Sequence, residues 1–258
     1  MVVYKGTATG NDGKTKKKTF KIKPADISGA KFDAEDAIWG AKASEVAVSG
    51  TFGEDDLELV AGGDFKVKYT AKAAGEATGN AKITGKGNFK GKASATYKVD
   101  ALDLNDANII VDATKAAKVK VTVTDKEGNK IAKKLYTVAT ESGDGEVTVT
   151  VTPSAKAAGN ITGEASVTAS AGKTKLGKVK VNKSFSKTFT GEAIELTEED
   201  FAAGKIEVGS LELGKDFEIV SYNKNIKKGK MSVTIQGIGE NSGVKTFKVK
   251  IVGKPLGN

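Results

Sequence analysis

Apolar and polar residues alternate with a period of two along much of this chain. Because a strand turns successive side chains to opposite faces, such alternation predicts strands with one buried and one solvated face, as in antiparallel sheets. The clearest runs lie at 65–69, 119–123, 147–151, 231–235 and 247–251. Apolar positions at helical spacing do not extend beyond short turns. The pattern therefore predicts an all-β fold.

Turn signals separate these runs. Residues 125–129 read as a hairpin loop in which Gly128 adopts a positive φ, and Gly-x-Asp at 62–64 and 214–216 precedes a strand. Thr197-Glu-Glu-Asp200 predicts a short helical turn closed by a capping box, and Asp33-Ala-Glu-Asp36 predicts a similar turn.

Part of the sequence is repeated. Residues 64–99 resemble residues 216–251, with three glycines in register at an offset of 152: Gly85, Gly87 and Gly91 against Gly237, Gly239 and Gly243. Half of that offset leaves room for one copy between them. The phrase Ala-Lys-Ala-Ala-Gly occurs at 71–75 and again at 155–159, and it predicts equivalent loops in the first copy and a diverged middle copy.

The repeat predicts tandem modules of immunoglobulin-like (Ig-like) size, each an antiparallel β-sandwich. The expected boundaries are 1–23 for a partial repeat or leading hairpin, 24–103 for module 1, 104–182 for the diverged module 2 and 183–258 for module 3. Tyr222 lies one residue later after its Asp than Tyr69 does, which predicts a one-residue bulge or a loop change before Tyr222.

The C-terminal copy resembles Ig-like repeats of Gram-positive, largely gut-dwelling bacterial surface proteins. The residues that carry the resemblance are Phe-Thr-Gly at 189–191, the run 214–225, Met-Ser-Val-Thr-Ile-Gln-Gly-Ile-Gly at 231–239 and Phe-Lys-Val-Lys-Ile at 247–251. In the first copy, 62–69 and 83–91 match the same pattern. The resemblance implies spacers, adhesive stalks or companions of glycan-active domains, and it brings no catalytic residues.

The composition excludes several kinds of functional site. The 258 residues contain no His and no Cys, so a neutral-pH imidazole base, a thiolate zinc site and a disulfide are excluded. The net charge is +9 and every basic residue is Lys, while aromatic residues are 6% of the chain. Specific nucleic-acid readers use Arg forks and stacking aromatics, so we expect no specific nucleic-acid binding.

Lysines alternate with apolar residues along predicted strands, as in Lys-Val-Lys-Val at 178–181. Such lysines are typical of a solvated face that resists edge aggregation, with weak attraction to anionic glycans as the alternative. No run of about 18 apolar residues is present, so we expect no membrane insertion. The N-terminus has no signal-peptide pattern and the C-terminus no sorting motif. A fragment of a longer exported protein and a virion protein are both compatible with these ends.

Several motifs imitate functional sites. Gly-x-Gly at 85–87 and 237–239 predicts hairpin turns rather than a phosphate loop, since no helix or Gly-Lys-Ser/Thr follows. Asp100, Asp103 and Asp106 lack EF-hand spacing and predict a polar junction between modules. Glu198, Glu199 and Asp200 favour a helix N-terminus over a catalytic carboxylate cluster.

Three further features have structural interpretations. Asn160-Ile-Thr162 matches a glycosylation sequon but is expected to be unmodified. The single Trp39 is predicted to pack in a core or junction, together with Ala37 and Ile38, rather than to stack on a sugar. A Lys–Asn isopeptide bond would require a buried Lys, Asn and carboxylate together, and it would lower the intact mass by one ammonia.

We expect no catalytic, cofactor-binding or metal-binding residues and no enzymatic activity. The hypothesis is an extracellular structural or adhesive spacer on a bacterial cell surface, whose partners are neighbouring modules of the same or a longer chain and either a surface glycan or a protein. A phage capsid-decoration or tail protein located in the virion is the first alternative. A carbohydrate-binding module, which would need a row of exposed aromatics, is the second.

Overall fold

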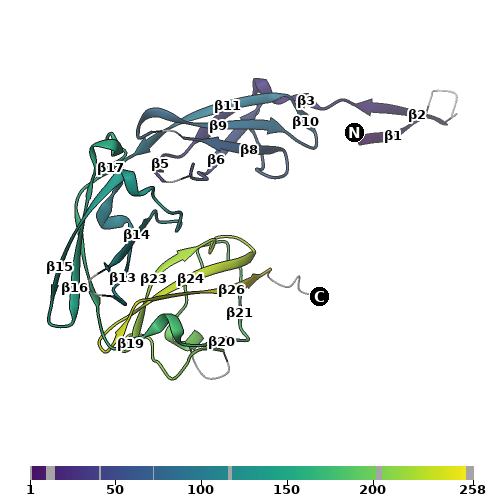
Figure 1. The fold of residues 1–258 in the computed structure, drawn as a ribbon. Coiled ribbons are helices and arrows are strands. Elements are labelled where there is room, and N and C mark those ends of the chain that lie inside the picture. The colour runs from purple at the N-terminus through teal and green to yellow at the C-terminus, as the bar shows by residue number, and fades with distance from the viewer. Residues whose placement is uncertain are drawn as a thin grey trace. The chain divides into compact units, whose positions relative to one another are not determined.

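The computed structural model describes residues 2–9, 15–40, 42–71, 73–115, 118–201 and 205–253. The fold is all-β, as predicted, and no helix in the described residues reaches seven residues. The chain forms two compact units, 1–100 and 101–258. Figure 1 labels most of the strands.

The first unit begins with an antiparallel hairpin of β1 (Val2–Thr9) and β2 (Thr15–Ile22). A three-stranded sheet follows in the order β4 (Lys31–Ala34), β6 (Val48–Phe52), β7 (Leu57–Glu58). A four-stranded sheet has the order β5 (Ala37–Ile38), β11 (Lys92–Asp100), β9 (Gly75–Gly85), β8 (Phe65–Thr70). The short β3 (Ala25–Asp26) runs parallel to β10 (Phe89–Lys90).

The core of the first unit lies between its two larger sheets. Phe65, Ile83, Tyr97 and Val99 come from the four-stranded sheet and are buried, whereas their sequence neighbours Lys66, Lys82 and Thr96 are exposed. Phe32, from the three-stranded sheet, meets Phe65 edge-on with ring centroids 5.2 Å apart. This arrangement is that of a β-sandwich, and it follows directly from the period-two pattern.

The second unit contains two successive sets of strands. The first set has β12 (Leu102–Asp103) parallel to β17 (Ile161–Thr162), the pair β13 (Asn108–Asp112) and β14 (Lys120–Thr124), and the sheet β15 (Tyr136–Gly143), β16 (Glu146–Pro153), β18 (Ala165–Ser170). The second set has β19 (Thr174–Lys175) parallel to β25 (Asn241–Ser242), the pair β20 (Val181–Lys183) and β22 (Ile206–Val208), and the sheet β21 (Ser186–Thr188), β26 (Val244–Val252), β24 (Gly229–Gly237), β23 (Phe217–Asn223).

Each of these three sets of strands opens with a short parallel pair and then a 3₁₀ turn. The turns are η1 (Ile27–Gly29), η2 (Leu104–Asp106) and η6 (Leu176–Lys178). The first residue of each turn is a fully buried aliphatic side chain: Ile27, Leu104 and Leu176. The 3₁₀ turns η4 (Lys133–Leu135), η5 (Ala155–Ala157) and η7 (Glu198–Phe201) also lie within the second unit.

Two of these openings share a close contact between an aspartate and a glycine. Asp26 caps η1 by accepting from the Ser28 N–H at 3.0 Å. A Cβ built on Gly91, whose φ is +85°, would lie 2.4 Å from Asp26 Oδ1. A Cβ built on Gly163, whose φ is +72°, would likewise lie 2.4 Å from Asp103 Oδ1. A larger residue would displace the cap, so glycine is required at both places.

The repeated Ala-Lys-Ala-Ala-Gly phrase does not mark equivalent loops, and that prediction is wrong. Its first copy leads from β8 into β9, whereas its second copy forms η5 and leads from β16 into β17. Strand β17 pairs with β12 just as β10 pairs with β3. The second copy precedes β17, so it is equivalent to the turn before β10. Short Ala- and Gly-rich runs fit several kinds of turn, so the shared sequence does not show that the two loops occupy equivalent positions in the fold.

Two further local predictions are wrong. Asp33 lies in β4, and Asp36 accepts from the Lys98 N–H at 2.9 Å, so residues 33–36 cap no helical turn. Lys-Val-Lys-Val at 178–181 is not one strand, because Lys178 ends η6 and β20 begins at Val181. Residues 174–182 pair and pack with the second set of the second unit, although the sequence assigns them to module 2. The four-part division of the chain stays a prediction.

Two turn predictions are confirmed. Asp125 N–H donates to the Asn129 carbonyl at 3.0 Å, and Gly128 has a φ of +75°. Gly62 and Gly214 have φ values of +81° and +82° and lie three residues before the first residues of β8 and β23.

The bulge before Tyr222 is also confirmed. The ladder of β23 and β24 shifts between Ile219 and Ser221, which leaves Val220 as the extra residue. Tyr222 then pairs with Val233, four residues before Gly237, just as Tyr69 pairs with Ala81, four residues before Gly85.

Deleting Val220 is expected to be tolerated. The shortened strand would have the spacing of β8 from Phe65 to Tyr69, so Tyr222 keeps its partner Val233. We expect the free energy of unfolding of the second unit to change by no more than about 1 kcal/mol. Urea unfolding followed by circular dichroism measures this. Deleting Val233 in β24, which has no bulge to absorb the loss, is the control and should abolish the cooperative transition because the register slips.

Candidate functional site

A buried polar network in the second unit surrounds Lys187, on the edge strand β21. Lys187 pairs in the ladder with Ile251 of β26. The corresponding pair in the first unit joins Ala37 of β5 to Val99 of β11, and Ala37 is buried. A lysine at this position therefore carries its charge toward the core, and only 25% of its side chain is exposed.

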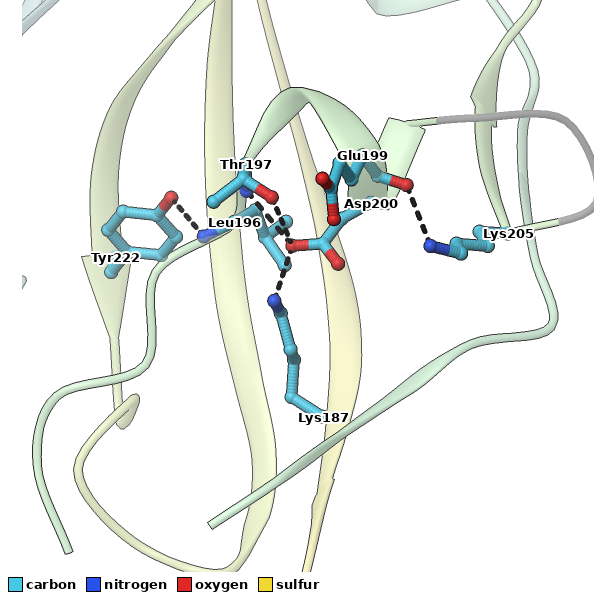
Figure 2. A network of polar contacts seen from close by, with 7 residues as sticks. All are labelled: Lys187, Leu196, Thr197, Glu199, Asp200, Lys205 and Tyr222. Atoms are coloured by element: carbon cyan, nitrogen blue, oxygen red, sulfur yellow. Dashed lines mark hydrogen bonds and ion pairs between the residues drawn. The ribbon is translucent and has the colours of Figure 1, made fainter. Parts of the chain in front are cut away.

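Asp200 neutralises this charge. Its side chain is 5% exposed, and its Oδ2 lies 2.6 Å from Lys187 Nζ (Figure 2). The same oxygen accepts from the Thr197 N–H at 2.9 Å and from Thr197 Oγ1 at 3.4 Å. The predicted capping box is thus present on the carboxylate side: Asp200 reaches back to the residue before η7. A buried charge requires such pairing and hydrogen bonding, because burial alone would be very costly.

Tyr222 holds the segment just before this turn. Its hydroxyl oxygen accepts from the Leu196 N–H at 2.9 Å (Figure 2). In the first unit, Tyr69 donates its hydroxyl proton to the Val46 carbonyl at 2.8 Å. Tyr222 thus fastens β23 to the segment that precedes β22, and Tyr69 fastens β8 to the segment that precedes β6. The Tyr222 hydroxyl accepts its hydrogen bond, whereas the Tyr69 hydroxyl donates its own.

Lys205 closes the other end of the turn. Its Nζ donates to the Glu199 carbonyl at 2.9 Å (Figure 2). Lys187 and Lys205 also place their Nζ atoms 5.9 and 5.7 Å from the centre of the Phe185 ring, within cation–π range. The network therefore fastens the chain between β21 and β22 onto the sheet. Lys187 and Asp200 neutralise each other and Lys205 binds a backbone carbonyl, which is the arrangement of a structural tether.

The pKa of the Tyr222 hydroxyl is raised above its ordinary value, chiefly by burial, while the hydrogen bond from Leu196 acts in the opposite direction. A raised pKa in the folded state means that the phenolate is less favourable there than in the unfolded chain. The contribution to stability is complete below the unfolded value of about 10 and is lost as the pH rises beyond it.

Tyr222→Phe is therefore expected to flatten the alkaline loss of stability. The variant loses about 1 kcal/mol near neutral pH, because the Leu196 N–H loses its acceptor. Above about pH 10 the wild type should decline more steeply than the variant. Urea unfolding at a series of pH values gives both curves, and the difference between them cancels the common titration of the lysines and of Tyr97 and Tyr136. Parallel curves would contradict the expectation.

The carboxylates singled out in the sequence do not converge. Asp200 is buried with Lys187, whereas Glu198 and Glu199 are exposed. Asp100 pairs with Lys98 at 2.7 Å, Asp103 accepts from the Asn105 N–H, and Asp106 pairs with Lys126 at 3.4 Å. Within the described ranges, no group of three or more potential ligands is placed to hold a metal ion.

The remaining motifs have structural surroundings. Gly85 and Gly237 end strands β9 and β24, and Gly87 and Gly239 lie in the turns that follow, as predicted. Trp39 packs against the core of the first unit beside buried Ala37, but Ile38 is 40% exposed, contrary to its predicted core position. Asn160 Nδ2 donates to the Ala157 carbonyl at 2.8 Å.

The network contains a Lys and a carboxylate but, among its drawn members, no Asn (Figure 2). A Lys–Asn isopeptide bond is not predicted by the sequence and is not tested by this network, and intact mass is its test. Sequence reasoning found the turn at Thr197–Asp200 but missed Lys187 as the partner of Asp200. The sequence signal for this pairing was that Lys187 occupies a strand position at which the first unit has the buried Ala37.

None of the helices in the described part of the chain is long and apolar enough to cross a membrane. No family model matches the chain, and neither a curated protein nor a solved structure matches it significantly.

Proposed function

We propose that this chain is a non-catalytic, load-bearing spacer built from tandem Ig-like β-sandwiches, belonging to an exported protein of a bacterial cell surface. The observation that carries the proposal is one kind of strand pair found in both units. An early strand of the sandwich runs parallel to its last strand: β5 with β11 in the first unit and β21 with β26 in the second.

The parallel direction decides how these pairs respond to tension. The early strand is pulled from its N-terminal end and the last strand from its C-terminal end. In a parallel pair these ends lie at opposite ends of the ladder. Tension therefore loads the inter-strand hydrogen bonds together, in shear, instead of opening them one at a time. In the second unit the loaded ladder includes three residue pairs, from Ser186↔Lys250 to Thr188↔Val252.

Other features support a passive role. The chain lacks the His and Cys residues that supply most general bases and thiol nucleophiles. The buried charges of Lys187 and Asp200 are paired with each other, and their network fastens a connecting segment. The resemblance of 214–225 and 231–239 to bacterial surface repeats supports the location.

Single-molecule pulling of the full chain tests the mechanical proposal. We expect discrete unfolding events, each releasing roughly 25 nm for about 75 residues, as follows from the extended length per residue. Shortening the interaction with Phe189→Pro, which removes the backbone N–H that donates to the Val252 carbonyl at 2.8 Å directly after β21, should lower the force of one event and leave the others. Smooth extension without discrete events would reject a load-bearing role.

Location is tested separately. Antibodies against the chain should label intact cells of the source bacterium. Recovery of the protein from purified phage particles, in copy numbers that match the particle symmetry, would instead establish the virion alternative.

A further inference from the structure

One face of the first unit carries lysines without neutralising partners. On the outward side of the sheet β8–β9–β11, the ladder places Lys66 across from Thr84 and Thr84 across from Lys92. The next row contains Lys68, Lys82 and Ser94. We call Lys66, Lys68, Lys82 and Lys92 the lysine face; all four are exposed.

The register sets two like charges directly against each other. Lys68 and Lys82 are direct cross-strand partners. Such pairs are destabilising in a sheet unless an anion lies between or beside them. The arrangement is therefore not explained by the stability of the sheet alone.

The sheet does not supply the missing anion. Strands β8, β9 and β11 contain two acidic residues, Glu76 and Asp100. Both pair with Lys98, with Nζ–O distances of 4.0 and 2.7 Å. No ion pair among the described residues includes a member of the lysine face.

The face also lacks the groups that would select a nucleic acid. The aromatic residues of these strands, Phe65, Tyr69 and Tyr97, alternate to the opposite side and pack in or against the core. Flexible ammonium groups on a flat sheet instead suit a polymer that offers charges in a row and needs no stacking. Lysines two residues apart on one strand, such as Lys66 and Lys68, are spaced by about 6.5–7 Å along the chain.

We propose that the lysine face binds a linear anionic polysaccharide. The polysaccharide lies across β8, β9 and β11, with its acidic groups against the four ammonium groups. It relieves the repulsion between Lys68 and Lys82. This deepens the proposed surface function by naming the partner class of the spacer. The binding depends on ion pairing at an exposed surface and is therefore sensitive to salt.

Affinity electrophoresis of the full chain through gels containing polygalacturonate tests the proposal, with dextran as the neutral reference. The face variant is Lys66→Gln, Lys68→Gln, Lys82→Gln and Lys92→Gln. The matched variant changes four exposed lysines of the second unit, Lys133, Lys134, Lys156 and Lys178, to Gln. Both lower the formal net charge by 4, from +9 to +5.

We expect polygalacturonate, but not dextran, to retard the wild type at low salt. The face variant should lose at least about tenfold in affinity, whereas the matched variant should stay within about threefold. Trp39 fluorescence during urea unfolding verifies that the face variant keeps its fold. Equal losses in the two variants would overturn the proposal in favour of overall charge, and absent retardation of the wild type would reject it directly.

A single-stranded oligonucleotide probe completes the test. If it bound more tightly than polygalacturonate, and only through the lysine face, the polysaccharide assignment would be wrong. The binding results do not depend on the pulling experiment. If one proposal is rejected, the other is still tested by its own measurement.

Discussion

Replacing Asp200 with Ala is expected to destabilise the second unit by about 3 kcal/mol. The variant leaves the Lys187 ammonium group in a largely buried place without its carboxylate, and the Thr197 N–H without an acceptor. Removing one partner of a buried pair costs more than the pair itself contributes, because the remaining charge has lost both water and counter-ion. Urea unfolding followed by circular dichroism measures the loss.

The double variant Lys187→Met/Asp200→Leu separates this cause from a general loss of packing. It removes both charges, and β5 already accommodates an apolar residue at the equivalent position Ala37. We expect it to recover most of the stability lost in Asp200→Ala. Glu199→Ala is the matched control, since Glu199 is exposed, and it should change stability by less than about 0.5 kcal/mol. A double variant no more stable than Asp200→Ala would show that the ion pair is not the cause.

Replacing Phe65 with Ala is expected to destabilise the first unit by about 3–5 kcal/mol. Phe65 is fully buried and contacts Phe32 edge-on. Four of the other nine buried residues of its core cluster are alanines, which cannot extend into the space that the ring leaves. A loss of this size is a large fraction of the stability of a small domain. Phe65→Leu should cost less, because it retains most of the apolar volume.

The single tryptophan makes this effect separable between the units. Trp39 packs against the core of the first unit, so its fluorescence reports the unfolding of that unit. We expect Phe65→Ala to shift the fluorescence transition, and Phe217→Ala, at the equivalent place in β23, to leave it unchanged. Leu57→Ala provides an exposed control in the first unit, since Leu57 is 58% exposed. Equal shifts from Phe65→Ala and Phe217→Ala would show that the two units unfold together.

The sequence by itself determined the strands and their faces. Alternation at 65–69 and 231–235 sufficed, because a side chain's face depends only on the parity of its position once the strand forms. The glycine turns before β8 and β23 were equally local. Even the bulge at Val220 could be derived, since one extra residue must be absorbed if Tyr222 is to keep its partner.

Only the tertiary structure decided which segments meet. The pairing of β19 with β25 assigned residues 174–175 to the last set of strands, and the pairing of β12 with β17 placed the repeated phrase in a different loop from its first copy. Lys187 and Asp200 became partners because η7 folds back over β21. The opposed Lys68 and Lys82 follow from the register of β8 on β9. Contacts between distant residues depend on how strands pair and pack, and the local alternation of residue types does not encode that.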